Sequence, residues 1–337
     1  MKNASLVVSA PYQKNEIFNP ASRLNRDDCL AFYRELKEQL AQNQISLNTQ
    51  DITSPFEAQI VIYNELPTEA CPNPKALSAA FLFESELIRP QDWVKSHHDR
   101  VEVNFTWNDD LVDNKKYFKF NFTHSGQVAF KKFHEKKKLC TLIAGSKSVT
   151  HPLELYSERL RSIEWFTENA PNDFDFYGMG WDRHTFTLPV VSRVLNRLSF
   201  LRKALAKGYP LYRGPVADKL STLSDYKFSI CYENAQGITG YITEKIFDSL
   251  AAGCIPVYWG APNIKDSVPE SCFIDRTQFK SHEELYHFIK SMPEDRYNQY
   301  LSDMAGYLQS EKHRLFEPGY NAAQVTKVIV SGLHAKN

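Results

Sequence analysis

Lys227-Phe-Ser-Ile-Cys-Tyr-Glu-Asn234 opens a stretch that continues as Ala235-Gln-Gly-Ile-Thr-Gly240, Tyr241-Ile-Thr-Glu-Lys-Ile-Phe-Asp-Ser-Leu-Ala-Ala-Gly253 and Cys254-Ile-Pro-Val-Tyr-Trp-Gly-Ala-Pro262. The order of apolar runs and polar turns predicts a buried strand, a turn, a helix and a second buried strand. Thr243 suits the amino-terminal cap of that helix, and Gly253 suits the left-handed position just past its end. The stretch therefore predicts a βαβ unit and a protein of the α/β class.

The polar residues of this unit gather where the first strand ends and the helix begins. Ligands of open α/β sheets bind at this edge, and a helix amino terminus offers free N–H groups and partial positive charge to a phosphate. Lys245 lies in the first helical turn, where a cation opposes the helix dipole by about 0.3–1 kcal/mol. A lysine that breaks this local rule is either solvated outside the helix or placed there for an anionic ligand. The second reading predicts a nucleotide-type ligand.

Length and charge set the broad limits. The chain has 337 residues, 42% of them hydrophobic, which is enough for two globular domains. Lysine plus arginine and aspartate plus glutamate number 40 each, so no overall field attracts nucleic acid or an anionic membrane. Any phosphate binding must come from local charge, and we expect no nucleic-acid partner.

The order of predicted elements places two α/β domains in series. Helical spacing extends from Asp27 to Gln42, and the connection between the domains falls between roughly Asn114 and Lys138. We assign residues 1–135 to the first domain, residues 136–317 to the second, and residues 318–337 to a carboxyl-terminal segment that packs back on the first domain.

Another helix of the second domain, predicted to start near Pro152, carries two arginines. Pro152 suits its first position, and Leu153, Tyr156, Leu160 and Ile163 form its apolar stripe. On a helical wheel Arg159 lies roughly 70° from the centre of this stripe and Arg161 roughly 130° from it. Arg159 is therefore expected to reach the edge of a cleft, whereas Arg161 faces solvent.

The motifs Tyr-Glu-Asn, Gly-Tyr-Ile-Thr-Glu-Lys and Gly-Cys-Ile-Pro-Val-Tyr-Trp-Gly-Ala-Pro resemble the donor site of α1,3/4-fucosyltransferases, glycosyltransferase family 10. The resemblance implies a GT-B fold, in which two Rossmann-like α/β domains face each other across a cleft. It also implies GDP-β-L-fucose as the donor substrate in the second domain. It assigns Lys245 and Arg159 to the diphosphate, Glu244 to the ribose, and Tyr241 and Asn234 to the donor pocket.

Two carboxylates follow the apolar run from Ala79 to Leu82 in the first domain. Phe83-Glu84-Ser85 resembles an element of the family's acceptor domain, which implies that Glu84 is the general base and Glu86 the second choice. Side chains alternate along a strand, so a strand continued through this segment would place both carboxylates on one face. The sequence does not choose between them, and a solvated acidic turn is the alternative.

The departing diphosphate needs its negative charge stabilised by a metal ion or by fixed cations. Asp173-Phe-Asp175 has the Asp-x-Asp pattern of metal-dependent transferases, but it also fits an ordinary half-exposed strand. The second interpretation is favoured. We expect Arg159 and Lys245 to supply the charge, with no metal site and no cofactor.

The cysteines and the hydropathy of the chain indicate its cellular compartment. The six cysteines are widely spaced, which favours buried free thiols in a reducing compartment. The sequence contains no window apolar enough for a membrane helix and no signal-peptide pattern at its amino terminus. Animal and plant members of the family that the chain resembles are membrane-anchored in the secretory pathway, so the resemblance implies a bacterial cytoplasmic enzyme. The sequence leaves open whether it associates peripherally with the inner face of the membrane.

The expected activity is inverting transfer of L-fucose to the 3-OH or 4-OH of a GlcNAc or Glc unit in a glycan acceptor. The sequence decides neither the acceptor nor the linkage, nor the oligomeric state. Two alternatives stay open. One is a GT-B transferase that uses another nucleotide sugar, and the other is a catalytically silent protein that binds a nucleotide sugar or a glycan.

Overall fold

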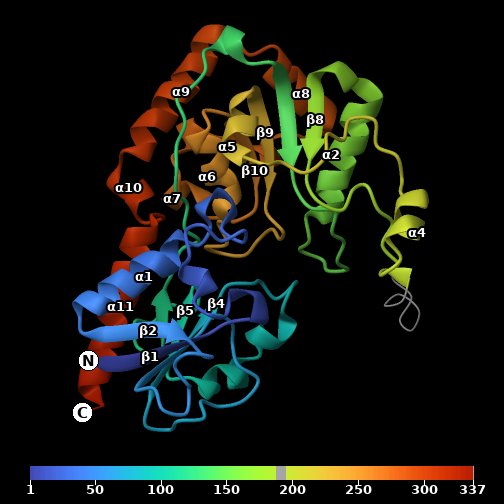
Figure 1. Cartoon of the computed structure of the whole chain (residues 1–337). Helices are drawn as coiled ribbons and strands as arrows, with labels where there is room; N and C mark the ends of the chain where they lie inside the picture. The colour runs from blue at the N-terminus through green and yellow to red at the C-terminus, as the bar shows by residue number, and fades with distance from the viewer. Residues whose placement is uncertain (187–194, 337) are drawn as a thin grey trace.

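The computed structural model describes residues 1–186 and 195–336, which form two parallel β-sheets with flanking helices (Figure 1). The first sheet has the strand order β2-β1-β3-β4-β5-β6, and the second has the order β11-β10-β9-β7-β8. All of the strand pairs are parallel. The α/β class and the two sheets predicted from the sequence are confirmed.

The strands of the first sheet are β1 (Lys2–Val7), β2 (Ile45–Thr49), β3 (Ile60–Tyr63), β4 (Leu77–Leu82), β5 (Val103–Thr106) and β6 (Tyr117–Lys119). Those of the second are β7 (Lys138–Ile143), β8 (Phe174–Tyr177), β9 (Tyr226–Tyr232), β10 (Ile255–Trp259) and β11 (Ile274–Asp275). The helices that the argument below uses are α1 (Ala31–Gln42), α2 (Tyr156–Asn169), α4 (Ser199–Ala204), α5 (Lys219–Ser224), α6 (Glu244–Ala251), α8 (His282–Lys290), α9 (Glu294–Leu308) and α11 (Pro318–Ala335), with the short helices α7 (Ile264–Ser267) and α10 (Glu311–Arg314) between them.

The central strands are buried on both faces, as is usual in parallel sheets covered by helices. Every residue of β3 and of β4 is buried, and so are six of the seven residues of β9. The strand order reverses between β1 and β3 in the first sheet and between β9 and β7 in the second. Such switch points leave a crevice at the carboxyl ends of the strands, where ligands bind.

The chain returns to the first domain at its end. Helix α11 lies beside α1 (Figure 1), and Ala322, Val325 and Ile329 belong to the same buried cluster as the strands of the first sheet. A hydrogen bond of 3.0 Å from the backbone N–H of Asn121 to Oδ1 of Asn321 adds to this contact. The first domain is therefore built from both ends of the chain.

Two local expectations were wrong. Helix α1 begins at Ala31, not at Asp27, because Asp27 and Asp28 have positive φ values of 54° and 56°, which a right-handed helix excludes. The segment between the two sheets lies within the range expected for the interdomain connection, after β6 ends at Lys119 and before β7 begins at Lys138.

Pro152 is not the first residue of a helix, because α2 begins four residues later. The backbone N–H of Gln236 donates to the carbonyl of Leu153 at 2.8 Å, and that of Leu155 donates to the carbonyl of Asn234 at 3.0 Å. These bonds form an antiparallel bridge between Glu154 and Ala235, in the loop after β9.

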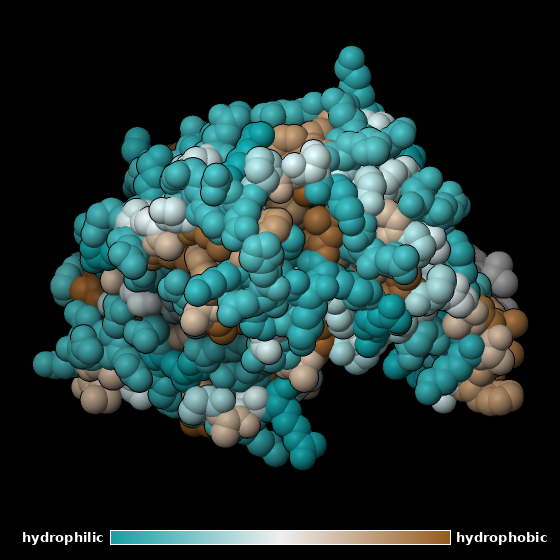
Figure 2. All heavy atoms as spheres, turned by 90° about the horizontal axis from the view of Figure 1, so that it is seen from above, coloured by the Kyte–Doolittle hydropathy of each residue, from teal (hydrophilic) through white to brown (hydrophobic). Residues whose placement is uncertain are grey.

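The surface is mostly hydrophilic in the view of Figure 2, with hydrophobic side chains gathered at one edge beside the grey atoms. Leu198, Phe200 and Leu205, in and around α4, are 49%, 84% and 51% exposed. Within the ranges described, no helix combines the length and the apolar character that crossing a membrane requires.

All six cysteines are free thiols. Cys140, Cys231, Cys254 and Cys272 are buried as expected, whereas Cys71 is partly exposed and Cys29 is exposed.

Candidate active site

A cavity of about 390 Å³ lies between the two domains, and we call it the interdomain cavity. The first domain contributes Arg26, Glu84 and Phe122 to its lining. The second domain contributes the carboxyl ends of β7 and β9, which flank the switch point of its sheet, and the first turns of α6. Six of the seven residues predicted for the site line this cavity, namely Glu84, Arg159, Asn234, Tyr241, Glu244 and Lys245.

The start of α6 is held by a buried carboxylate that sequence reasoning missed. Thr243 occupies the cap position, but its side chain makes no capping hydrogen bond, so this part of the prediction was wrong. Its hydroxyl instead donates to Oε2 of Glu233 at 2.7 Å, and its backbone N–H donates to Oε1 at 2.8 Å. Glu233 is fully buried directly after β9. An acidic residue immediately after a buried strand was the signal that could have identified it.

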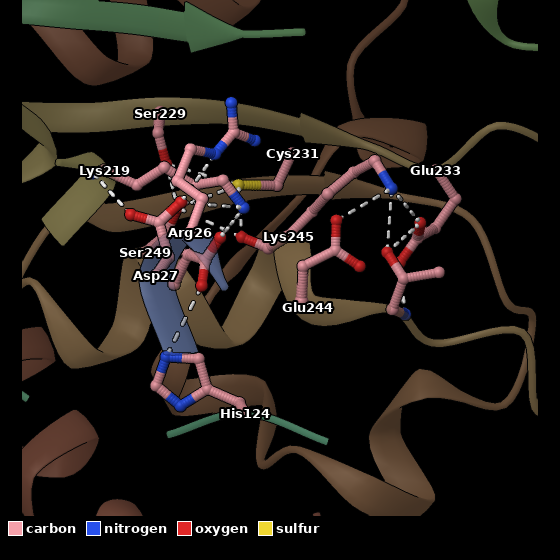
Figure 3. A network of polar contacts seen from close by, with 12 residues as sticks. Arg26, Asp27, His124, Lys219, Ser229, Cys231, Glu233, Glu244, Lys245 and Ser249 are labelled. Atoms are coloured by element: carbon pink, nitrogen blue, oxygen red, sulfur yellow. Dashed lines mark hydrogen bonds and ion pairs between the residues drawn. The ribbon is translucent and has the colours of Figure 1, made fainter. Parts of the chain in front are cut away.

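Lys245 lies between Glu233 and Glu244 (Figure 3). Its Nζ is 3.3 Å from Oε2 of Glu233, 2.8 Å from the hydroxyl of Thr243 and 3.8 Å from Oε1 of Glu244. Burial works to lower the pKa of Lys245, but the two carboxylates raise it above its usual value. The lysine is thus a fixed cation in the cavity, and the alternative of a solvated side chain is wrong.

Glu244 is the acidic partner at the same helix start. Burial works to raise its pKa, but Lys245 and Lys219 lower it to about 2. A carboxylate with this pKa is ionised throughout the physiological range and acts only as a hydrogen-bond acceptor. It suits a ligand that presents hydroxyl donors, such as a ribose.

Arg159 is buried, with 4% exposure, and projects from α2 to the end of β9. Its Nε and Nη2 donate to the carbonyl oxygen of Tyr232 at 3.2 and 2.6 Å, and Nη2 also donates to Oδ1 of Asn234 at 3.0 Å. Burial lowers the pKa of this guanidinium. Arg161 is exposed and pairs with Glu158, so the wheel separated the two arginines correctly.

Asn234 and Tyr241 extend this chain of hydrogen bonds toward the first domain. Nδ2 of Asn234 donates to the hydroxyl of Tyr241 at 3.2 Å. The ring of Tyr241 packs against Trp107 and Phe122 of the first domain, with centroid distances of 4.6 and 6.0 Å. Tyr241 therefore both lines the cavity and joins the two domains.

The structure separates Glu84 from Glu86. Strand β4 ends at Leu82, so the alternation of side chains does not continue through this segment. Glu84 lines the cavity, whereas Glu86 is exposed 3.7 Å from His151 and lies outside the cavity lining. Burial raises the pKa of Glu84, although Lys147 and Lys245 oppose this change. The indole N–H of Trp93 donates to the Glu84 carbonyl at 2.9 Å and fixes its backbone.

A second polar cluster joins the domains beside α6, and sequence reasoning missed it (Figure 3). Nζ of Lys219 lies 2.9 Å from Oδ2 of Asp248, and its backbone N–H donates to Oδ1 of Asp27 at 3.2 Å. Nε2 of His124 lies 3.4 Å from Oδ1 of Asp248. Burial raises the pKa of Asp248 to about 6 and lowers that of His124 to about 4. The position of Asp248, one helical turn after Glu244, was the only signal in the sequence.

The Asp-x-Asp pair is bound by protein cations. Asp175 is buried and lies 2.8 Å from Nζ of Lys138 and 2.6 Å from Nε of Arg213. Asp173 lies 2.8 Å from Nζ of Lys290. Both carboxylates are thus occupied within the second domain. The expected half-exposed strand was wrong in detail, because β8 begins at Phe174, after Asp173, and three of its four residues are buried.

Comparisons with known proteins agree with this site. Residues 205–316 match the model of the carboxyl-terminal part of glycosyltransferase family 10 (fucosyltransferase). The α-(1,3)-fucosyltransferase FucT of Helicobacter pylori is 44% identical over 87 residues, which are 26% of this chain and 18% of that protein. An α-(1,4)-fucosyltransferase of Arabidopsis thaliana is 39% identical over 80 residues, which are 23% of this chain and 20% of that protein. The matches thus span only about a fifth of each relative.

Solved structures resemble nearly the whole chain. A crystal structure of an α1,3-fucosyltransferase has a TM-score of 0.58 at 15% identity and covers 98% of this chain and 90% of its own. An α-glucosyltransferase in complex with UDP-glucose and DNA has a TM-score of 0.57 at 11% identity and covers 98% and 99%. The fold is therefore of the GT-B type. The family match and the motifs at the interdomain cavity confirm the resemblance of this chain to glycosyltransferase family 10, the fucosyltransferases.

Proposed function

We propose that this chain is an inverting fucosyltransferase that moves L-fucose from GDP-β-L-fucose to the 3-OH or 4-OH of a GlcNAc or Glc unit in a glycan. One observation carries the proposal. Two cations of the second domain, the buried Arg159 and the partly buried Lys245, and one carboxylate of the first domain, Glu84, line a single cavity between the domains. A crystal structure of an α1,3-fucosyltransferase with GDP-fucose shares this fold, with a TM-score of 0.54 at 17% identity.

The donor would lie with its diphosphate at the start of α6. Lys245 and Arg159 would offset the charge that develops on GDP as the bond to fucose breaks. Glu244 would accept hydrogen bonds from the ribose hydroxyls. These cations are already held in place by Glu233 and by the carbonyl of Tyr232, so they need little rearrangement when the charge appears.

Glu84 would act as the general base. It takes the proton of the acceptor hydroxyl while the oxygen attacks the anomeric carbon on the face opposite GDP, and the bond between that carbon and the diphosphate oxygen breaks. An attack from the opposite face inverts the anomeric configuration. A partly buried carboxylate with a raised pKa suits this role, because it holds a transferred proton better than a fully solvated one.

We propose further that fixed cations, and no divalent metal ion, stabilise the leaving group. The carboxylates of the Asp-x-Asp pattern are occupied by Lys138, Arg213 and Lys290, which supports this proposal. Turnover should then persist in the presence of a chelator. The six free thiols support action in a reducing compartment such as the cytoplasm.

The decisive experiment incubates the protein with GDP-fucose and lactose, N-acetyllactosamine, lacto-N-biose or chitobiose, and identifies the product linkage by NMR. Formation of an α1,3- or α1,4-fucosylated product supports the proposal. The proposal is contradicted if GDP is released but no fucosylated glycan forms and none of the four acceptors is consumed.

A second candidate is a GT-B transferase with a different nucleotide sugar. It is favoured by the similar TM-scores of 0.58 for the fucosyltransferase and 0.57 for the α-glucosyltransferase, because the fold alone does not select a donor. A panel of GDP- and UDP-sugars in the same assay separates the two. A catalytically silent binding protein would bind GDP-fucose but transfer nothing.

A further inference from the structure

A second cavity, of about 640 Å³, opens on the second domain, and we call it the outer cavity. It lies on the other side of α2 from the interdomain cavity and shares no lining residue with it. Helix α2 presents Tyr156 and Arg159 to the interdomain cavity but Arg161 and Trp165 to the outer one. The remaining walls are the end of β10, residues 276–280 and the start of α8, which lies beside α2 (Figure 1).

Arg276 is the most unusual residue of the outer cavity. It is only 7% exposed, and its guanidinium takes part in none of the ion pairs found among the described residues. Nη1 donates to the carbonyl of Phe279 at 2.7 Å, and the guanidinium lies over the ring of Trp259 at 5.6 Å from the centroid. Its Nε is buried without a hydrogen-bond partner among the described residues. Buried charges are normally paired, so this arginine lacks an anion.

The other charged groups around Arg276 do not supply that anion. Glu158 and Glu283 also line the outer cavity, but Glu158 pairs with Arg161, and Glu283 is 71% exposed and lies 3.7 Å from Nε2 of His287. His282 accepts or donates a 2.9 Å hydrogen bond with Ser162, and burial, Arg276 and Arg161 lower its pKa to about 4, so it is neutral at physiological pH. The positive charge of Arg276 is therefore available to a ligand.

A further cation lies at the rim. Lys280 is exposed, lines the cavity and forms no ion pair with the described residues. Helix α8 begins two positions later, and Glu283 and Glu284 in its first turn offset the partial positive charge of its amino terminus. The positive region of the outer cavity therefore consists of Arg276 and Lys280.

Two indole rings stand next to this positive region. Trp165 and Trp259 are both half-buried and line the cavity. Nε1 of Trp259 donates to Oε1 of Gln236 at 3.1 Å, and Trp165 stacks with His282 at 6.3 Å between centroids. Their orientations are therefore fixed. An aromatic face provides a flat apolar surface, which suits the apolar face of a sugar ring.

We propose that the outer cavity binds an anionic sugar, a pyranose that carries a carboxylate or a phosphate. Its anionic group pairs with Arg276 and Lys280, which have the donor geometry and charge that carboxylates and phosphates require. Its ring packs against Trp165 and Trp259. Because the outer cavity shares no residue with the interdomain cavity, this proposal does not depend on the proposed transferase activity.

The test titrates the full chain with glucuronic acid, glucose 6-phosphate or glucose and follows the indole ¹H–¹⁵N signals of its five tryptophans by NMR. The variants Trp165→Phe and Trp259→Phe assign the two relevant signals. We expect these two signals to shift with at least one of the anionic sugars and not with glucose. If only one of the two anionic sugars shifts these signals, the result shows whether the site prefers a carboxylate or a phosphate.

Lys280→Ala is the main variant, because an exposed lysine can be removed without unfolding the protein. We expect it to weaken binding of the anionic sugar by about tenfold, as the loss of one charge-assisted contact predicts. Lys327→Ala is the matched control, since Lys327 is an exposed lysine on α11 outside the cavity and should leave the affinity unchanged. GDP titrated into the same samples reports on the interdomain cavity separately.

Three results would overturn the proposal. The first is the absence of a shift at Trp165 and Trp259 with either anionic sugar. The second is an equal response to glucose, which would remove the role of charge. The third is unchanged binding in Lys280→Ala, which would place the anion elsewhere.

Discussion

The two walls of the interdomain cavity differ in how firmly their polar side chains are held. On the second-domain wall each functional group has a partner: Arg159 bonds to the end of β9, and Lys245 is held by Glu233 and Thr243. On the first-domain wall the carboxylate of Glu84 forms no hydrogen bond or ion pair with any described residue, and only its backbone is fixed. The second wall thus presents cations that are already held in place, and the first presents one carboxylate without a partner among the described residues.

This difference has a physical reason. Fixed dipoles and charges stabilise a developing charge best when they need not reorient during the reaction. A general base must instead change its protonation state, and a strong hydrogen bond to its charged form would lower its pKa and weaken it. The contrast between the walls therefore predicts separate effects on binding and on turnover.

The largest effect is expected for Glu84→Gln. If the free carboxylate is the base, turnover with GDP-fucose and the best acceptor should fall about 10²–10⁴-fold. GDP affinity, measured by calorimetry, should stay unchanged because the second wall is intact.

Glu86→Gln is the matched control, since Glu86 lies two residues away but outside the cavity. It should keep the turnover of the unmodified protein. An active Glu84→Gln protein would remove the functional distinction between the two walls.

Lys245→Met tests the second wall. It leaves Glu233 buried without its cation, which should cost about 3–5 kcal/mol of folding stability in urea unfolding. GDP affinity should fall as well. Adding Glu233→Gln removes the unpaired charge, so the double variant should recover stability but not GDP affinity.

Recovery of both properties in the double variant would show that Lys245 supports the fold and does not bind the nucleotide. Recovery of neither would show that Glu233 itself has a further role at the start of α6.

The second wall was largely predictable from the sequence, because its residues belong to regular elements. Periodicity separated Arg159 from Arg161 on α2, and Gly253 has the left-handed φ of 62° expected just after α6. Lys245 was recognisable because it opposes the dipole of its own helix. Each of these inferences needed only local geometry.

The first wall was not predictable in the same way. The choice between Glu84 and Glu86 depended on where β4 ends, and strand ends carry little signal in a sequence. Parts of the second wall were missed as well, because Glu233 and Asp27 reach Lys245 and Lys219 through contacts that are set by tertiary packing. Thr243 lost its capping role for the same reason, since a buried carboxylate nearby competed for its hydroxyl.

Gly240→Ala should disturb the alignment of the two walls. Gly240 has a φ of +81°, and an added Cβ would lie 2.3 Å from the carbonyl oxygen of Trp107 and 2.7 Å from Oδ2 of Asp109, both in the first domain. We expect a loss of about 10–10²-fold in transfer, because small misplacements of reacting groups are costly. GDP affinity should change much less.

Gly214→Ala is the matched control for backbone strain. Gly214 has a φ of +92°, but an added Cβ meets nothing within 4 Å. It should lower folding stability by about 1–2 kcal/mol without a selective loss of transfer. Equal effects of the two variants would show that strain, and not domain alignment, explains the result at Gly240.

The smallest effect is expected in the pH profile. Glu84 acts as a base only when ionised, so the rate should fall as the pH drops through its pKa, which burial raises above the usual glutamate value. Lys147 and Lys245 oppose this rise. A bound diphosphate offsets their charge, so the acid limb of kcat should lie at higher pH than that of kcat/KM for the donor, by about one unit or less. Lys147→Ala should move the limb of kcat/KM upward toward that of kcat, and a downward shift would contradict the proposed coupling between the fixed cations and the free base.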